Sequence, residues 1–359
     1  MVKNMDRIKR ITPTDKAAFA AAKERWDSIA KPLGSFGLLE DDICKIAAVR
    51  CTPDVDISKR TAVIMCGDHG VVAEGVTQCG SEVTAECAAA IAEGRSNINA
   101  VARCYDIGVI AVDMGMSHDP RCDKLINRHI ADGTANITRG AAMTREQLER
   151  AITAGMDIVG ELKASGTKLI VTGEMGIGNT TSAAAISSVL LGLPAEKVTG
   201  RGAGLSSEGL RRKIETVKRA VNVNFPDKCP HAVGRDPFEV LRRLGGFEIA
   251  GMTGLFLGGA HYRVSVVIDG VISAAAAAIA CGIEPLCKEY MLASHCSHEP
   301  AAEGLLKLCG CKPVIDAGLR LGEGTGGALF VSLLDGALAL YNGAHRFGDT
   351  SIERYVEQK

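Results

Sequence analysis

Four short segments of the chain are almost continuously apolar, and longer segments of mixed apolar and polar character separate them. The apolar segments cover residues 61–66, 109–112, 168–172 and 264–268. Uninterrupted apolar runs of this length are typical of strands in a sheet that is covered on both faces. Because helix-like segments lie between them, the order predicts an α/β fold with a parallel sheet and right-handed crossovers.

Each of the four predicted strands ends in a turn that contains glycine and an acidic residue. In an open parallel sheet, ligands bind outside the carboxyl ends of the strands. We therefore expect the functional side chains to lie in these turns.

The two ends of the chain are predicted to be helical. Residues 14–30 are rich in Ala, Lys and Glu, and residues 326–355 begin with an apolar stretch. We expect the two ends to pack together as a small helical domain formed by residues 1–29 and 326–359. The large domain is then predicted to cover residues 30–325.

The composition restricts the partners that the chain is expected to bind. Its 359 residues include 41 Lys and Arg against 42 Asp and Glu, so the formal net charge is −1. A nucleic-acid partner would normally require a basic face and is not expected. The 41 glycines and the aromatic content of only 4% suit tight turns around a small polar ligand. The longest apolar run, residues 271–283, is shorter than the roughly 20 residues that span a bilayer, so no membrane association is expected.

The 13 cysteines are scattered along the chain and include no CxxC pair. The first twelve residues are charged and lack the apolar core of a signal peptide. We interpret the cysteines as reduced thiols of a cytoplasmic protein.

The most informative motif is GEMGIGNTTSA at residues 173–183, which follows a predicted strand and opens a predicted helix. Glycines let backbone N–H groups face a ligand, and the helix N-terminus adds a positive dipole end, so the segment is suited to binding a phosphate. It is not a Walker A loop, because no Lys-Ser or Lys-Thr pair follows the last glycine. The pattern alone leaves open a plain strand-to-helix turn capped by serine or threonine.

Two further glycine clusters carry charged residues. The cluster at residues 200–204 precedes Lys213, which could supply a cation for the same phosphate or lie on a solvated helix face. The cluster at residues 322–327 places Glu323 between glycines, where a carboxylate can reach a ligand and act as a general base. A loop carboxylate bound by backbone N–H groups is the alternative, and Glu174 has a similar setting.

Three histidines raise the alternative of a metal site. His69 lies in the turn after the first predicted strand, and His295 and His298 are three residues apart with Glu299 adjacent. That spacing could bind a metal on a helix. Pro300 favours a loop instead, so neither a metal nor another cofactor is expected.

Taken in order, these motifs closely resemble those of the nicotinate-nucleotide–dimethylbenzimidazole phosphoribosyltransferases, the enzymes that make the lower-ligand nucleotide of cobalamin. The resemblance runs from about residue 15 to the C-terminus, and GEMGIGNTTSA and LGEGTG are its most specific strings. The other matching strings are KPLGSFGLLE from Lys31, GDHGV from Gly67, GRG from Gly200 and GGFEIAG from Gly245. It implies a large Rossmann-like domain, a small helical domain built from both termini, and a homodimer.

The resemblance also implies a reaction. Nicotinate mononucleotide and 5,6-dimethylbenzimidazole, or a related base, would give α-ribazole 5′-phosphate and nicotinate, with inversion at the anomeric carbon. Nicotinate leaves with a neutral ring nitrogen and needs no acid, whereas the incoming base must lose its N–H proton. One general base is therefore required.

Site residues follow from the resemblance position by position. Glu323 matches the family's catalytic glutamate, Glu174 a second acidic residue near the base pocket, and Ser297 a residue near the nicotinate. The positions that match the substrate and phosphate cradle are Gly176, Ile177, Gly178, Asn179, Thr180, Gly202 and Lys213.

This chain departs from the family pattern around the pocket for the accepted base. Cys79 and Cys87 stand where relatives often have other small or polar residues, and Phe36 replaces the usual leucine of its motif. The accepted base is therefore left open between benzimidazoles, purines and phenols.

A non-catalytic nucleotide-binding or sensing protein of the same fold is the alternative function. Glu174 and Glu323 argue against it, since a sensor needs no general base. A kinase would need a Walker A lysine or a pair of magnesium-binding carboxylates, which the sequence does not offer.

Overall fold

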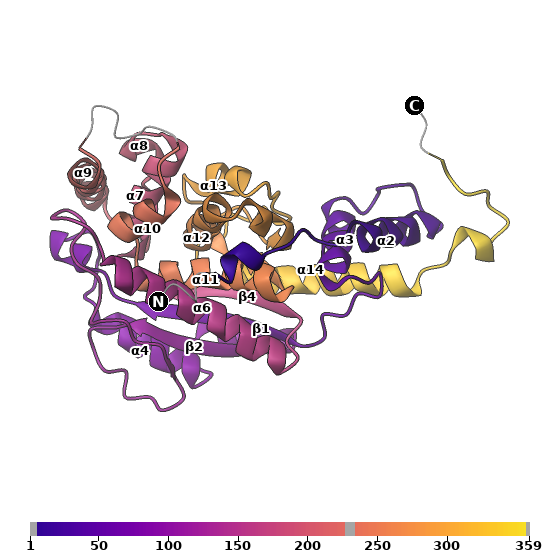
Figure 1. Cartoon of the computed structure of the whole chain (residues 1–359), viewed down its shortest axis with the longest axis horizontal. Coiled ribbons are helices and arrows are strands. Elements are labelled where there is room, and N and C mark those ends of the chain that lie inside the picture. The colour runs from indigo at the N-terminus through magenta and orange to yellow at the C-terminus, as the bar shows by residue number, and fades with distance from the viewer. Residues whose placement is uncertain (1–5, 227–233, 357–359) are drawn as a thin grey trace.

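Six parallel strands form one sheet in the order β3-β2-β1-β4-β5-β6 in a computed structural model that describes residues 6–226 and 234–356 (Figure 1). This is the strand order of the Rossmann fold, whose crevice lies between β1 and β4, where the order reverses. The strands are β1 (Arg60–Gly67), β2 (Ile107–Gly115), β3 (Ile126–Asn127), β4 (Leu169–Met175), β5 (Ser265–Ile268) and β6 (Met291–Ala293).

The four predicted strands are confirmed as β1, β2, β4 and β5, and the sequence analysis missed β3 and β6. These two lie at the edges of the sheet and have only two and three residues. Such short segments give no apolar run that could be told apart from loop sequence.

Helices cover both faces of the sheet, which explains why the strands are apolar throughout. Along β1, Val63 and Met65 belong to one buried cluster, and Ala62 and Ile64 belong to another on the opposite face. The first cluster includes α6 (Arg145–Ala164), α7 (Asn179–Leu191), α8 (Ala195–Val198), α9 (Ser207–Asn224), α10 (Pro237–Leu244), α11 (Phe247–Tyr262), α12 (Gly270–Ile283) and α13 (Ala302–Leu308). The second includes α2 (Lys16–Ser28), α3 (Leu38–Arg50), α4 (Glu82–Ala92), α5 (Asn97–Cys104) and α14 (Thr325–Gly343).

Helices α2 and α3 lie beside the C-terminal part of α14, away from the sheet (Figure 1). The rings of Trp26 and Tyr341 are 5.1 Å apart, and the Ala30 N–H donates to the His345 carbonyl. The expected packing of the N-terminal helix on the C-terminal one is therefore present. Helix α3, which the prediction assigns to the large domain, also lies here.

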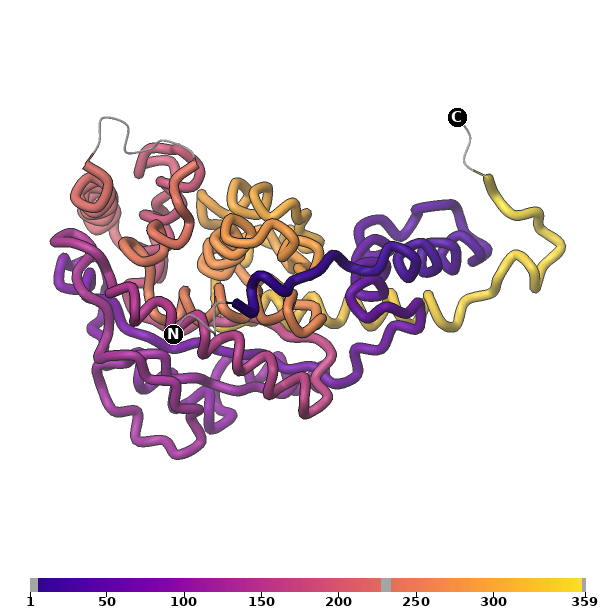
Figure 2. The backbone as a smooth tube through the Cα atoms, in the orientation of Figure 1, coloured from indigo at the N-terminus to yellow at the C-terminus, as the bar shows by residue number. Residues whose placement is uncertain are grey.

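The segment before α2 takes a different course and crosses the main body (Figure 2). Arg7 donates a 2.7 Å hydrogen bond to Asp157 of α6, and Ile8 is buried in the cluster that contains α6 and α11. The division into two domains at residues 29 and 326 stays a prediction.

The predicted buried helix at residues 271–283 is confirmed as α12, most of whose side chains are buried against the sheet and α11. Within the ranges that the structure describes, no helix is long and apolar enough to cross a membrane.

Candidate active site

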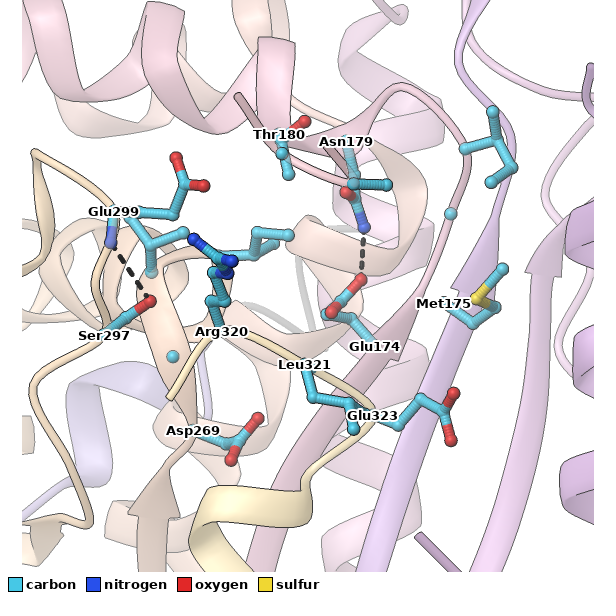
Figure 3. A pocket seen from close by; sticks show the side chains of 18 of the residues that line it. Glu174, Met175, Asn179, Thr180, Asp269, Ser297, Glu299, Arg320, Leu321 and Glu323 are labelled. Carbon is cyan, nitrogen blue, oxygen red and sulfur yellow. Dashed lines mark hydrogen bonds between the residues drawn. The ribbon is translucent and has the colours of Figure 1, made fainter. Parts of the chain in front are cut away.

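A cavity of about 260 Å³ lies at the carboxyl ends of β4 and β5 (Figure 3). It adjoins a second cavity of about 850 Å³, and the two share Gly202, Ala203, Glu299, Arg320 and Leu321. The first cavity is lined by Glu174, Met175, Gly176, Ile177, Asn179, Thr180, Gly202, Ala203, Asp269, Gly270, Val271, Ile272, His295, Ser297, Glu299, Arg320, Leu321, Gly322 and Glu323. The sheet therefore brings together the three glycine clusters of the sequence.

The N-terminus of α7 opens toward this cavity. Its N-cap, Gly178, has a φ of +97° and provides no side-chain cap. Within the described parts of the chain, no hydrogen bond uses the backbone N–H groups of Gly178 or Thr180. A helix N-terminus with free N–H groups is a ready anion site, so the alternative of a turn capped by serine or threonine is disfavoured.

Lys213 extends from α9 to the same point. Its ammonium donates a 2.7 Å hydrogen bond to the Thr180 hydroxyl, and a Cβ on Gly202 would lie 3.2 Å from its Nζ. The side chain is buried, and this burial lowers the pKa of Lys213 to about 8, although the charge of Glu299 acts in the opposite direction. The solvated-face alternative for Lys213 is therefore wrong: the lysine is a buried cation source beside the open helix end.

Glu323 lies on the opposite side of the cavity in a tightly constrained loop. Gly322, Glu323 and Gly324 have φ values of +89°, +59° and +85°, all in the left-handed region. The Glu323 carboxylate accepts hydrogen bonds from the Asn97 amide at 3.0 Å and from the Ile98 backbone N–H at 3.3 Å. Figure 3 shows its carboxylate turned toward the side of Met175 rather than toward Asp269.

Asp269, at the end of β5, anchors that loop. One carboxylate oxygen accepts from the Gly324 N–H at 3.1 Å, and the other accepts from the Gly327 N–H at 2.7 Å. Burial raises the pKa of Asp269 to about 7, against the opposing effect of these backbone bonds. The N-terminus of α14 is thus satisfied from within the protein, whereas that of α7 is open.

Glu174 stands between the two glycine loops at the end of β4. It accepts a hydrogen bond from the Asn179 side-chain amide, and a Cβ on Gly322 would lie 2.8 Å from its Oε1 (Figure 3). Burial raises the pKa of Glu174 to about 7, although the Asn179 bond lowers it. At neutral pH this carboxyl can therefore exchange a proton with a ligand.

Ser297 also lines the cavity, and its hydroxyl accepts a 3.5 Å hydrogen bond from the Glu299 N–H. Glu299 and Arg320 line both cavities. The sequence analysis named Glu299 only beside the two histidines of the metal alternative, and it offered no local signal for Arg320. Asp269 was also missed, although it stands in one of the acidic turns that follow the predicted strands.

The two cysteines predicted for the base pocket do not line either cavity. Cys87 of α4 lies close enough to Glu323 for that charge, after burial, to raise the pKa of its thiol. Cys79 is exposed in the loop before α4. A role for either in selecting the base stays a prediction.

The segment that contains His295 and His298 is a loop, as Pro300 suggested. His295 forms an isolated β-bridge with Ile315. Its Nδ1 shares a 2.9 Å hydrogen bond with the Ser294 hydroxyl. In the described ranges, no three His, Cys, Asp or Glu side chains are grouped so that they could hold a metal ion.

The chain matches a family model described as phosphoribosyltransferase over residues 11–352. A protein from Acetivibrio thermocellus named nicotinate-nucleotide–dimethylbenzimidazole phosphoribosyltransferase is 41% identical over 351 residues, which is 98% of each chain. One of the same name from Ruminiclostridium cellulolyticum is 42% identical over 93% of each chain. The crystal structure of CobT from Thermus thermophilus superposes with a TM-score of 0.86 at 36% identity and covers 94% of this chain and 100% of that one.

Proposed function

The chain belongs to this phosphoribosyltransferase family, and we propose that it transfers the phosphoribosyl group of nicotinate mononucleotide to 5,6-dimethylbenzimidazole or a related base. The products are α-ribazole 5′-phosphate and nicotinate. The observation that carries this proposal is that an open helix N-terminus and a glutamate in a constrained loop line one cavity.

The 5′-phosphate of the nucleotide fits the N-terminus of α7. Thr180, whose N–H is free, lines the cavity there, and the ammonium of Lys213 bonds to its hydroxyl. A bound phosphate dianion would raise the pKa of Lys213 and so oppose the effect of burial, because an adjacent anion stabilises the ammonium form. Binding at this point leaves the ribose and the nicotinate ring to extend through the cavity toward Ser297.

Glu323 is the proposed general base. The incoming base attacks the anomeric carbon through one ring nitrogen as the C–N bond to nicotinate breaks, and the other ring nitrogen gives its proton to the Glu323 carboxylate. General-base help of this kind contributes about 10²- to 10⁴-fold to the rate, and the rest comes from holding the reactants in line.

Inversion at the anomeric carbon follows from this arrangement. The nicotinate ring occupies the β face of the ribose in the substrate, so a base that displaces it directly must arrive on the α face. An intermediate attached to the protein would give retention instead, and the proposal includes none. The anomeric proton coupling of the product, measured by NMR, tests this point: an α-riboside supports direct displacement and a β-riboside contradicts it.

We further propose that the protein forms a homodimer and works in the cytoplasm, as the family resemblance and the reduced thiols suggest. The described cysteines are all free, from Cys44 to Cys311. Light scattering on the protein as it elutes from a size-exclusion column measures its mass in solution and so tests the dimer directly. A mass near the 37.6 kDa of one chain would contradict the dimer.

The experiment that tests the reaction is a mixed-base assay. The purified protein is incubated with nicotinate mononucleotide and equimolar 5,6-dimethylbenzimidazole, benzimidazole, adenine, phenol and p-cresol, and the products are identified by mass spectrometry. The proposal predicts one dominant riboside phosphate, with an equal amount of nicotinate released. Binding of nicotinate mononucleotide without nicotinate release for any base would contradict the proposal and favour a nucleotide sensor.

A further inference from the structure

A buried pair of titratable side chains lies beneath the phosphate-binding turn and has no part in the reaction proposed above. His69, in the GDHG motif after β1, places its Nε2 2.7 Å from Oε1 of Glu248 in the first turn of α11. His69 is 2% exposed and Glu248 is fully buried. Both residues come from strings that match the family, GDHGV and GGFEIAG, and the proposed reaction uses neither residue.

Both ring nitrogens of His69 have a partner. Nε2 is hydrogen-bonded to Glu248, and Nδ1 is hydrogen-bonded to the Ser182 hydroxyl, 2.9 Å away. Burial of the imidazole lowers the pKa of His69, but the carboxylate of Glu248 raises it, and the net shift is upward. The two hydrogen bonds hold the ring at both edges.

Glycines make the space for this pair. A Cβ on Gly246 would lie 2.3 Å from Cε1 of His69 and 2.4 Å from Oε2 of Glu248. A Cβ on Gly178 would lie 3.1 Å from the Cβ of His69. Gly178 is the N-cap of α7, so the histidine packs directly against the turn that opens this helix, and Asn179 and Thr180 of that turn line the cavity.

Ser182 connects the pair to the same helix. It lies in the first turn of α7, four residues after Gly178, and is fully buried. His69 therefore contacts the start of α7 at two points, by packing against Gly178 and by bonding to Ser182. The side chain of Glu248 fixes the ring from the opposite edge.

We propose that His69, held by Glu248, is a positioning residue that fixes the N-terminal turn of α7 for the 5′-phosphate of the nucleotide. The proposal rests on the proposed function for the identity of the ligand. It assigns His69 no contact with substrate: the histidine acts through Ser182 and Gly178. A rigid turn keeps the N–H groups aimed at the phosphate, so less ordering is required when the nucleotide binds.

Ser182→Ala is the sharpest test, because it removes one bond to His69 and leaves the bond between His69 and Glu248 intact. Ser187→Ala is the matched control on the same helix, since Ser187 is also buried and its hydroxyl bonds to the Ala183 carbonyl at 2.6 Å. The measurements are calorimetric Kd values for nicotinate mononucleotide and for inorganic phosphate, with kcat and the KM of the base.

The proposal predicts that Ser182→Ala weakens binding of both phosphate-bearing probes by about 3- to 10-fold, the equivalent of one lost hydrogen bond. The kcat value and the KM of the base stay within about twofold, because the general base is untouched. Ser187→Ala leaves all four quantities unchanged. The proposal is overturned if Ser182→Ala binds both probes as the wild type does, or if kcat and all affinities fall together in both serine variants.

His69→Gln is the second variant, checked for folding by circular dichroism. Its amide can reach Glu248 in place of Nε2 but offers nothing at the position of Nδ1, so it should reproduce the Ser182→Ala pattern. Failure of the proposed function can be told apart from failure of this proposal. If the wild type binds nicotinate mononucleotide but releases no nicotinate, the proposed reaction is wrong, while the Kd comparison still decides the role of His69. A wild type that binds neither probe overturns both.

Discussion

The Glu323 carboxylate accepts a 3.0 Å hydrogen bond from the side-chain amide of Asn97, the first residue of α5. Because the Ile98 N–H donates to the other carboxylate oxygen, the proposed general base is oriented by a helix N-terminus. Hydrogen bonds to a carboxylate are stronger than those between neutral groups and fix its direction. The proposed base is therefore held in place by a helix far away in the sequence.

Asn97→Ala should lower kcat by about 3- to 10-fold, because one of two bonds that orient Glu323 is lost. The Kd of nicotinate mononucleotide should not change, since Asn97 does not line either cavity. Asn97→Asp should be more damaging than Asn97→Ala, because it places a second negative charge beside Glu323. Steady-state kinetics of the two variants check the order, and an aspartate variant more active than the alanine variant would refute the orienting role.

Gly173→Ala should displace the loop that carries Glu323, because Gly173 of β4 lies against the backbone of that loop. A Cβ at this position would lie 2.9 Å from the carbonyl carbon of Glu323, so the loop itself must shift. We expect a loss of about 1–3 kcal/mol in unfolding free energy and a fall in kcat of about 10-fold or more. Denaturant titration and kinetics measure the two effects.

Gly336→Ala is the control for that variant. Gly336 lies inside α14 and a Cβ there would meet nothing within 4 Å. Alanine should therefore leave kcat unchanged and raise the stability by up to about 1 kcal/mol. Equal losses in the two glycine variants would mean that the close approach of Gly173 to Glu323 does not matter.

Binding of nicotinate mononucleotide should weaken as the pH rises above about 8. The pKa of Lys213 in the free protein is about 8, because burial disfavours its charge, so above this pH most molecules must take up a proton to bind the phosphate. By linkage, affinity should fall by up to about tenfold per pH unit. The phosphate keeps its charge throughout this range because its second pKa is about 6.

Calorimetry in two buffers of different ionisation enthalpy detects that proton uptake. Lys213→Met should bind the nucleotide more weakly and lose the pH dependence above 8. A wild type whose affinity is level from pH 7 to 10 would show that Lys213 stays protonated in the free protein.

The two carboxyls with raised pKa should make the fold less stable as the pH rises. Burial raises the pKa values of Glu174 and Asp269 to about 7, above their usual values of 4.5 and 3.8. As the pH rises, the unfolded chain therefore releases these two protons at a lower pH than the folded protein does. The contribution of the two carboxyls to stability is fully present below about pH 4 and is lost as the pH rises to 7. Urea titrations at pH 5, 6 and 7 should show the loss in the wild type and a shallower slope in Glu174→Gln and Asp269→Asn. Parallel slopes in all three proteins would rule out the shifts.

Much of the fold could be predicted because the four long strands are apolar on both faces. The edge strands β3 and β6 could not, since two or three residues carry no periodicity. The expectation that helices at the two ends of the chain pack together also holds, through Trp26 and Tyr341. The pattern could not show that α3 packs beside α2, because the sequence of a helix does not show which neighbour its buried side contacts.

For the site, the glycine clusters could be predicted but their different roles could not. The clusters that contain Gly178 and Gly324 each open a helix, yet only the second has its N–H groups bound by Asp269. That carboxylate follows a strand more than fifty residues earlier in the chain, so no local pattern shows the contact. The same holds for the bond between Asn97 and Glu323 and for the pairing of His69 with Glu248.

The role of Glu323 is tested by measuring both the turnover of Glu323→Gln and its affinity for nicotinate mononucleotide. Glutamine keeps the shape of the side chain and an oxygen for Asn97 but cannot take up a proton. We expect a Kd for the nucleotide within about twofold of the wild type and a kcat for 5,6-dimethylbenzimidazole that is about 10²- to 10⁴-fold lower. A variant that binds the nucleotide normally and turns over at nearly the wild-type rate would contradict the assignment of Glu323 as the general base.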